Sequence, residues 1–327
     1  MNKSLLLFQP GSFNSLHCTI TMDEAFDFNE DIHTKLSIST ESSPSTILKH
    51  HRDLVYIEPT SSFKDPLSRE DLVTNLFSTS SVNNILFIPE PLLALYSHGL
   101  DTGIVIDCGH SGSRACFVSK GVVVPQSIFE SSCGGEMVTN SLRDLCASQE
   151  TSVDFWTKIK HEHCFVSKSG ISVDNYQRVV FETNPNSCRQ FFKISKEAYQ
   201  SSECLFSGDH SVTSLVGNVL NFINSLPELD LDLIPIVVIG GSSALFGFSR
   251  RLSYELTGSS LPQPMKPGVS ERGRYHIRVI VGELEEQALV AFKGIGNILN
   301  FIQNRDLFVS RVEFEKYGKG IIHVKSF

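Results

Sequence analysis

The stretch Ile104–Phe117, IVIDCGHSGSRACF, constrains the fold of this chain more than any other. It consists of an apolar strand, a turn that contains Asp107, Gly109 and Gly112, and a second strand. Glycines at the end of a strand let backbone N–H groups approach a ligand without a Cβ in the way, and serine hydroxyls add further donors. The turn therefore suits a phosphate group, although the same residues also favour an ordinary hairpin turn.

A second glycine turn follows an apolar strand later in the chain. Residues Ile236–Ile239 run into Gly240-Gly241-Ser242-Ser243, and a helix is predicted from Phe248 to Leu256. In a strand–Gly-Gly–helix arrangement, the helix N-terminus lies where the backbone can come close to a ligand. Such a place favours the binding of an anion or a nucleotide. With one such turn expected in each of two lobes, the pair predicts a nucleotide clamped in the cleft between them.

Apolar periodicity predicts the remaining elements. The predicted strands are Leu5–Phe8, Leu16–Ile20, Val55–Glu58, Asn84–Ile88, Gly103–Asp107 and Arg114–Val118. The predicted helices are one that follows a capping box at Ser68–Asp71, then Glu90–Gly99, Glu136–Cys146, Val153–His163 and Ser211–Leu226. Because 327 residues exceed what one core usually supports, we expect two α/β lobes with a cleft between them.

Composition excludes several classes of function. The formal charge of -8, with no long basic run, argues against direct binding of nucleic acid. No apolar run reaches the roughly 20 residues of a membrane span, so no membrane partner is expected. The eight cysteines are scattered like reduced core thiols, which indicates a cytosolic or nuclear protein. His50, His51, His161 and His163 lack accompanying ligands, so no metal site is predicted from them.

Five segments, taken in order, resemble the actin superfamily. They are IPEPLLALY (Ile88–Tyr96), IVIDCGHSGS, Lys160 with CFVS (Cys164–Ser167), IVVIGGSSALFGF (Ile236–Phe248) and the tail FVSRVEFEKYGKGIIHVKSF (Phe308–Phe327). The resemblance implies a two-lobed actin-like α/β fold with a nucleotide cleft. It implies a first lobe at residues 1–127, with 297–327 packing back on it, and a second lobe at 128–296.

The resemblance also implies the site residues for ATP or ADP with Mg²⁺. The first phosphate loop would include Gly11 and Ser12, and the second phosphate loop would comprise Asp107, Gly109, Ser111, Gly112 and Ser113. The adenosine side would comprise Gly134, Lys160, Gly240, Gly241 and Ser242. Two of the residues would be catalytic. Asp107 would orient waters around Mg²⁺, and Glu90 stands where actins have a glutamine that positions the attacking water.

Two departures from the actin pattern weaken the expected activity. The first loop reads FQPGSF at Phe8–Phe13, so an aspartate and the phosphate lysine of actins are missing, and His161 replaces a glutamate near the ribose. Nucleotide is therefore expected to bind weakly or not at all, with very weak or no ATPase activity. The segment Ile20–Leu54 is several dozen residues shorter than in actins, which implies a reduced outer subdomain and the loss of a filament contact.

The resemblance and the departures together imply a non-polymerising structural subunit of a multiprotein complex, whose partners are other protein subunits. One fitting assembly is dynactin, in which the chain would lie at the end of an actin-like filament in the cytoplasmic cytoskeleton. Another is a nuclear chromatin-remodelling complex, in which the chain would pack on a helix of the motor subunit. The alternative from another class is an active actin-like ATPase that forms filaments.

Overall fold

The computed structural model describes most of the chain in eleven segments. They are residues 4–10, 15–21, 36–39, 52–146, 152–168, 178–182, 190–226, 233–257, 276–281, 289–302 and 305–325. The chain divides into two compact units. The first comprises Met1–Val105, Cys116–Ile128 and Leu289–Phe327, and the second comprises Ile106–Ala115 and Phe129–Ala288.

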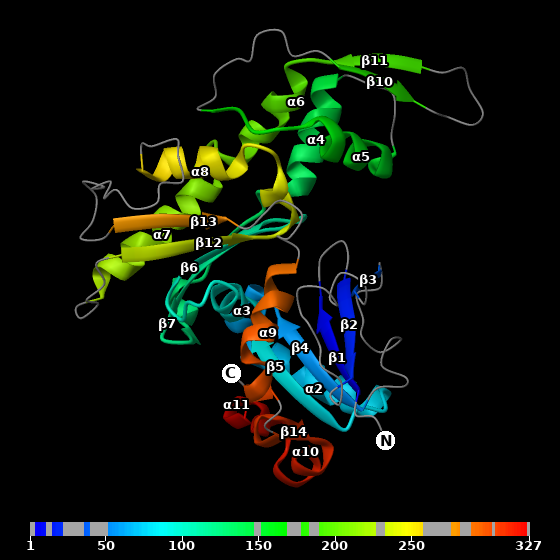
Figure 1. The fold of residues 1–327 in the computed structure, drawn as a ribbon, viewed down its shortest axis with the longest axis vertical. Helices are drawn as coiled ribbons and strands as arrows, with labels where there is room; N and C mark the ends of the chain where they lie inside the picture. The colour runs from blue at the N-terminus through cyan, green and yellow to red at the C-terminus, as the bar shows by residue number, and fades with distance from the viewer. Residues whose placement is uncertain are drawn as a thin grey trace. The chain divides into compact units, whose positions relative to one another are not determined.

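The first unit is built on a mixed sheet (Figure 1). Its strands are β1 (Ser4–Gln9), β2 (Ser15–Thr21), β3 (Leu36–Ser39), β4 (Asp53–Glu58), β5 (Asn84–Pro89) and β14 (Val309–Ser310), in the order β14-β5-β4-β1-β2-β3. β1 pairs parallel with β4, and β4 pairs parallel with β5. β1 pairs antiparallel with β2, so the two predicted strands Leu5–Phe8 and Leu16–Ile20 form a hairpin. The described helices of this unit are α2 (Pro66–Thr79), α3 (Glu90–Tyr96), α9 (Val290–Ile302), α10 (Arg311–Tyr317) and α11 (Ile322–Lys325).

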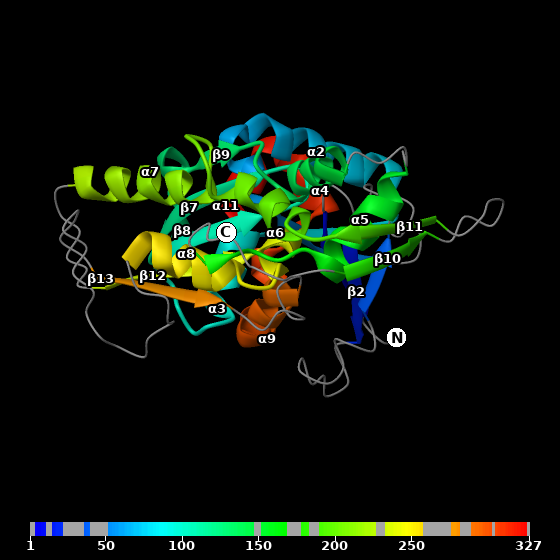
Figure 2. The same ribbon diagram turned by 90° about the horizontal axis from the view of Figure 1, so that it is seen from above.

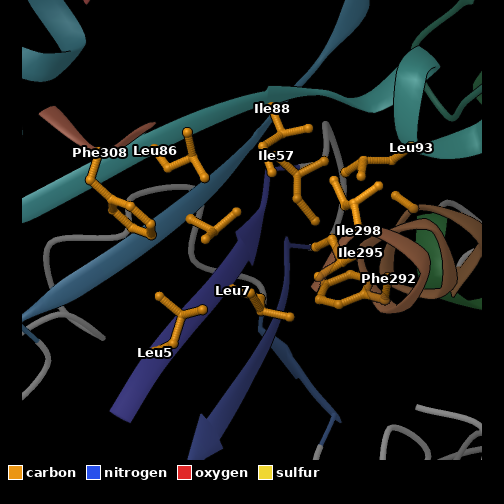
Figure 3. Close-up of a cluster of buried hydrophobic side chains, with 12 residues drawn as sticks. Leu5, Leu7, Ile57, Leu86, Ile88, Leu93, Phe292, Ile295, Ile298 and Phe308 are labelled. Atoms are coloured by element: carbon orange, nitrogen blue, oxygen red, sulfur yellow. The ribbon is translucent and has the colours of Figure 1, made fainter. Parts of the chain in front are cut away.

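Both faces of this sheet are buried. Successive side chains of a strand point to opposite faces, so one strand contributes to the core on each side of the sheet. Leu5 and Leu7 of β1 belong to one apolar cluster with α3 and α9, which is shown in Figure 3. Leu6 and Phe8 of the same strand belong to a second cluster with α2 and α11. The run of apolar residues in β1 thus serves two cores at once, which explains why it does not alternate with polar residues.

The C-terminal segment packs on the N-terminal strands and α2 within the first unit. β14 pairs antiparallel with β5. The guanidinium of Arg311 donates to the backbone carbonyls of Phe77, Ser80 and Val82, which lie at and beyond the end of α2. These bonds satisfy carbonyl groups that a helix end leaves without an internal partner.

The second unit is built on a second mixed sheet. β6 (Gly103–Cys108) and β7 (Ser113–Ser119) pass from one unit into the other, and the strand order is β13-β12-β6-β7-β8, with β9 beside β7. The other strands of this sheet are β9 (Phe129–Ser131), β12 (Leu233–Ile239) and β13 (His276–Val281) of the second unit, and β8 (Val122–Val123), whose residues belong to the first unit. A separate antiparallel pair joins β10 (Arg178–Glu182) and β11 (Gln190–Ile194).

Four helices in the described part of the second unit follow the predicted ranges closely, and a fifth, the short α6, was not predicted. They are α4 (Gly135–Cys146), α5 (Val153–His163), α6 (Glu197–Gln200), α7 (Val212–Ser225) and α8 (Phe248–Thr257). Figure 2 shows α7 and α8 alongside each other and α8 beside β13, and both pairs are in contact. Every helix among the described residues is too short or too polar to span a lipid bilayer.

The predicted start of one helix is wrong. α2 begins at Pro66 rather than after Ser68, because Asp65 caps it by accepting a hydrogen bond from the Leu67 N–H at 3.1 Å. Proline also favours the first turn of a helix, where its missing N–H costs nothing. α8 begins at Phe248, as predicted, but a short 3-10 turn, Gly241–Ala244, comes before it. The expected helix N-terminus beside the Gly240-Gly241 pair is therefore not found.

Candidate functional site

The two glycine turns lie in the same unit and contact each other, whereas we expected one in each lobe. The hydroxyl of Ser242 donates to the carbonyl of Gly109 at 2.7 Å. Gly240 has φ +92°, and a Cβ there would lie 2.5 Å from both Asp107 Oδ1 and the carbonyl oxygen of Cys108. Glycine at position 240 is therefore required by the packing of the protein on itself.

The first turn supports the start of α4. The Gly109 N–H donates to the carbonyl of Gly112 at 2.9 Å, which closes the hairpin. The N–H of Gly135 donates to the Gly109 carbonyl at 3.0 Å, and the N–H of Glu136 donates to the His110 carbonyl at 2.8 Å. These bonds engage N–H groups of the first turn of α4, which could otherwise bind an anion.

The other predicted phosphate-loop residues are also engaged in packing. Ser113 is fully buried, and its hydroxyl donates to the Cys133 carbonyl at 2.5 Å. A Cβ at Gly112 would overlap the Ser131 carbonyl, and a Cβ at Gly134 would lie 2.6 Å from the Gly112 nitrogen. Ser111 is exposed at the tip of the turn. The glycines and Ser113 thus hold the turn closely against the residues that precede α4.

Asp107 lies at the end of β6 beside an arginine that the sequence did not single out. Arg114 Nη1 lies 3.6 Å from Asp107 Oδ2, and Arg114 Nε lies 3.4 Å from Glu130 Oε1. Burial raises the pKa of Asp107 from its usual value of 3.8 to about 6, although the positive charge of Arg114 opposes this rise. The carboxyl is 14% exposed, so loss of solvation outweighs the ion pair.

Substituting Asp107 by asparagine is expected to raise stability above pH 6 and to change it little below pH 4. The folded chain holds the carboxyl proton more tightly than the unfolded chain, so the wild type loses stability as pH rises through about 4 to 6. The loss should be about 1–3 kcal/mol, and the neutral amide of Asn avoids it. Urea unfolding of both proteins between pH 4 and pH 8 measures this. A wild type that gains stability over that range would show that the Arg114 pair dominates instead.

A pocket of about 510 Å³ lies in the second unit beside the second turn. It is lined by Lys160, His161, Glu162, His163, Cys164, Phe165, Gly241, Ser242, Ala244, Leu245 and Phe246. Three predicted cofactor-binding residues, Lys160, Gly241 and Ser242, thus share one wall. Phe246 is 69% exposed, so it presents an aromatic surface at this pocket.

Lys160 is held in place by the start of α4. Its ammonium group donates to the Gly135 carbonyl at 3.0 Å, and burial lowers its pKa. Burial, followed by the charge of Lys160, lowers the pKa of both His110 and His161. The two imidazoles are therefore neutral at pH 7.

Glu90 lies in the first unit, at the first position of α3. It is buried, and its Oε1 accepts a hydrogen bond from the side-chain amide of Gln9 at 2.7 Å. Gln9 follows directly from the apolar core of β1, so the end of that strand and the start of α3 meet at this contact. Gly11 and Ser12, which we expected in the first phosphate loop, lie outside the described residues.

The described residues fit one end of a nucleotide and do not fit Mg²⁺. The pocket has the volume of a small-molecule site, and its ammonium, hydroxyl and aromatic groups suit a base and a sugar. Mg²⁺ requires several oxygen ligands in octahedral geometry. Asp107 instead faces a guanidinium, and no group of three or more Asp, Glu, His or Cys in the described part of the chain could hold a metal ion.

Sequence reasoning missed Gln9, Arg114 and Gly135. Gly135 carried a signal, because it follows Gly134 at the start of a predicted helix. In the structure, a Cβ at Gly135 would overlap the Ser242 hydroxyl. Arg114 carried a weaker one, as a charged residue at the start of an apolar strand. Gln9 carried none, because its partner Glu90 is 81 residues away.

Comparison with known proteins identifies the family. The family model for actin matches residues 44–178 and 150–327. A centractin from Schizosaccharomyces pombe is 25% identical over 239 residues, which cover 68% of this chain and 62% of the centractin. Actin-like protein 9 from Rattus norvegicus is 27% identical over 286 residues, which cover 82% of this chain and 65% of that protein.

Actin-like protein 9 from Mus musculus is 23% identical over 301 residues, which cover 86% of this chain and 67% of that protein. The chain thus spans less than two thirds of the length of the first two relatives. The predicted α/β architecture is confirmed, and its two larger sheets are mixed. The reduced outer subdomain concerns residues that the structure largely leaves undescribed. The chain belongs to the actin family.

Proposed function

We propose that this actin-family chain is a non-polymerising structural subunit of a multiprotein assembly, at the end of an actin-like filament in dynactin-type transport machinery. Its partners are other protein subunits, and its place is the cytoplasmic cytoskeleton. Support comes from the resemblance of CFVS (Cys164–Ser167) and VVIGGSS (Val237–Ser243) to the dynactin pointed-end subunit, and from the similarity to a centractin. In this proposal the two units correspond to the two lobes of actin.

In this proposal a nucleotide is a structural filler. The observation that carries this part is the internal use of the phosphate-loop groups, since the Gly109 N–H and the Ser113 hydroxyl both bond within the protein. Groups already bonded in the ground state cannot strengthen their hydrogen bonds to a phosphate in the transition state without breaking existing contacts. Lys160, Gly241 and Ser242 would hold the base and sugar of ATP or ADP.

ATP hydrolysis by the purified chain is expected to stay at the background rate, and Glu90→Gln is expected to leave it there. Glu90 accepts a hydrogen bond from Gln9, and Asp107 faces Arg114, so neither carboxylate has the surroundings of an activated base or a metal ligand. A phosphate-release assay with wild type, Glu90→Gln and Asp107→Asn measures this. Hydrolysis above background that Glu90→Gln lowers by tenfold or more would identify an active ATPase instead.

High-speed sedimentation tests the non-polymerising part of the proposal. The shortened segment Ile20–Leu54 removes a contact through which the resemblance implies that filaments grow, so the chain should stay in the supernatant with ATP and Mg²⁺ at any practical concentration. A pellet that appears above a critical concentration and contains filaments would overturn this part. The Glu90→Gln variant serves as the matched control, because it alters the candidate catalytic residue and leaves Ile20–Leu54 unchanged.

A further inference from the structure

We propose that Arg114 takes the place of a divalent cation beside Asp107, so that this turn excludes Mg²⁺. The inference concerns the same turn as the proposed nucleotide site, but it does not require any nucleotide to bind. It rests on the positions of three charged side chains from three adjacent strands, β6, β7 and β9.

Both oxygens of the Asp107 carboxylate face groups of the protein. Oδ2 lies 3.6 Å from Arg114 Nη1. Oδ1 lies against the backbone of Gly240, where a Cβ would come within 2.5 Å of it. A hydrated Mg²⁺ keeps several waters and needs room for them around a carboxylate. The packing on one oxygen and the guanidinium near the other leave little space for such a shell.

Arg114 is held in this position by strand pairing. Arg114 and Glu130 are direct partners in the antiparallel ladder of β7 and β9, so their side chains lie on the same face of the sheet. Arg114 Nε lies 3.4 Å from Glu130 Oε1. The guanidinium thus lies between two carboxylates, within ion-pair distance of each, and its donors form a planar fork suited to such pairing.

The charges in this cluster explain the exclusion. Asp107 and Glu130 together supply two negative charges facing one guanidinium, which is permanently positive in proteins. A divalent ion brought to Asp107 would meet the repulsion of that guanidinium at short range. If Arg114 were removed, two carboxylates would face a common space, and paired carboxylate oxygens are the ligands that hard cations prefer.

Titration with Mn²⁺ alone, followed by electron paramagnetic resonance, tests the inference. Wild type and Asp107→Asn are expected to bind Mn²⁺ equally, because no Mn²⁺ ion is expected at Asp107 in wild type. Arg114→Gln is expected to bind Mn²⁺ at least tenfold more tightly than wild type, and the double variant with Asp107→Asn should lose this gain. Arg114→Lys retains the positive charge and should behave like wild type.

Two results would overturn the inference. One is a wild-type Mn²⁺ site that Asp107→Asn abolishes, which can be observed even if Arg114→Gln fails to fold. The other is a folded Arg114→Gln protein with wild-type Mn²⁺ affinity, because Arg114 would then not be what excludes the ion. Neither result bears on assembly into a complex or on sedimentation, so failure here is distinguishable from failure of the proposed function.

Discussion

Replacing Gly294 with alanine should destabilise the first unit near the upper end of the roughly 1–3 kcal/mol that overpacking typically costs. Gly294 lies on α9, where this helix crosses α3, and a Cβ at that position would overlap the carbonyl oxygen of Leu93. The obstacle is backbone within a helix, which cannot rotate away as a side chain would. The thermal transition of the unit should fall by roughly 5–10 °C.

Gly217→Ala is the matched control for this substitution. Gly217 also lies within a helix, α7, but a Cβ there would meet no atom within 4 Å. Alanine has the higher helix propensity, so this variant should be more stable than wild type by about 0.5–1 kcal/mol. Opposite signs for the two variants would support the close contact of α9 with α3. A neutral or stabilising Gly294→Ala would contradict it.

Replacing Arg251 with alanine should destabilise the second unit by about 3–5 kcal/mol. This buried arginine of α8 donates to Glu255 at 2.7 Å, to the Ser167 carbonyl at 3.0 Å and to both oxygens of Glu203 at 3.2 and 3.1 Å. Its guanidinium also lies 5.2 Å from the centre of the Phe206 ring. Alanine would leave the carboxylate of Glu203 with the Ser167 hydroxyl but without its charged donor, and the Ser167 carbonyl without the guanidinium.

Lys158→Ala provides the comparison with an exposed ion pair. Lys158 and Glu162 lie four residues apart on α5, with their charged atoms 3.8 Å apart and their side chains 71% and 50% exposed. Exposed pairs of this kind contribute little, so the variant should stay within about 0.5 kcal/mol of wild type. Chemical denaturation of both variants measures the contrast. An Arg251→Ala protein as stable as Lys158→Ala would show that the buried network does not form as described.

Most elements of the fold could be predicted from local patterns. The apolar run Leu5–Phe8 predicted a strand, and β1 buries all four of these side chains on its two faces. α5 was predicted with the bounds that the structure gives, Val153–His163. In the structure, Ser152 caps its start and Cys164 follows its end in extended conformation. The start of α2 was missed because two competing cap signals, Asp65 and Ser68, lie three residues apart.

The sequence predicted where the backbone is closely approached, but not which groups approach it. The glycines at 109, 112, 240 and 241 were singled out as places of close approach. The structure places protein atoms against Gly109, Gly112 and Gly240, whereas a Cβ at Gly241 would meet no atom within 4 Å. Sequence could not distinguish an approaching ligand from an approaching backbone, because both require the same absence of a Cβ. The Gln9–Glu90 bond depends on tertiary structure, because 81 residues separate its partners. The Arg114–Asp107 pair lies across one turn, but the sequence does not show that the two side chains face each other.

Mass spectrometry of the proteins that co-purify with an endogenously tagged copy, at low salt, tests the central claim most directly. We predict dynactin subunits in constant proportion to the tagged chain, because a fixed subunit at a filament end has a defined copy number. Recovery of a chromatin-remodelling motor with nuclear actin-related proteins would contradict the dynactin assignment. Recovery of the chain alone or bound only to itself would contradict the claim that it is a fixed subunit of an assembly.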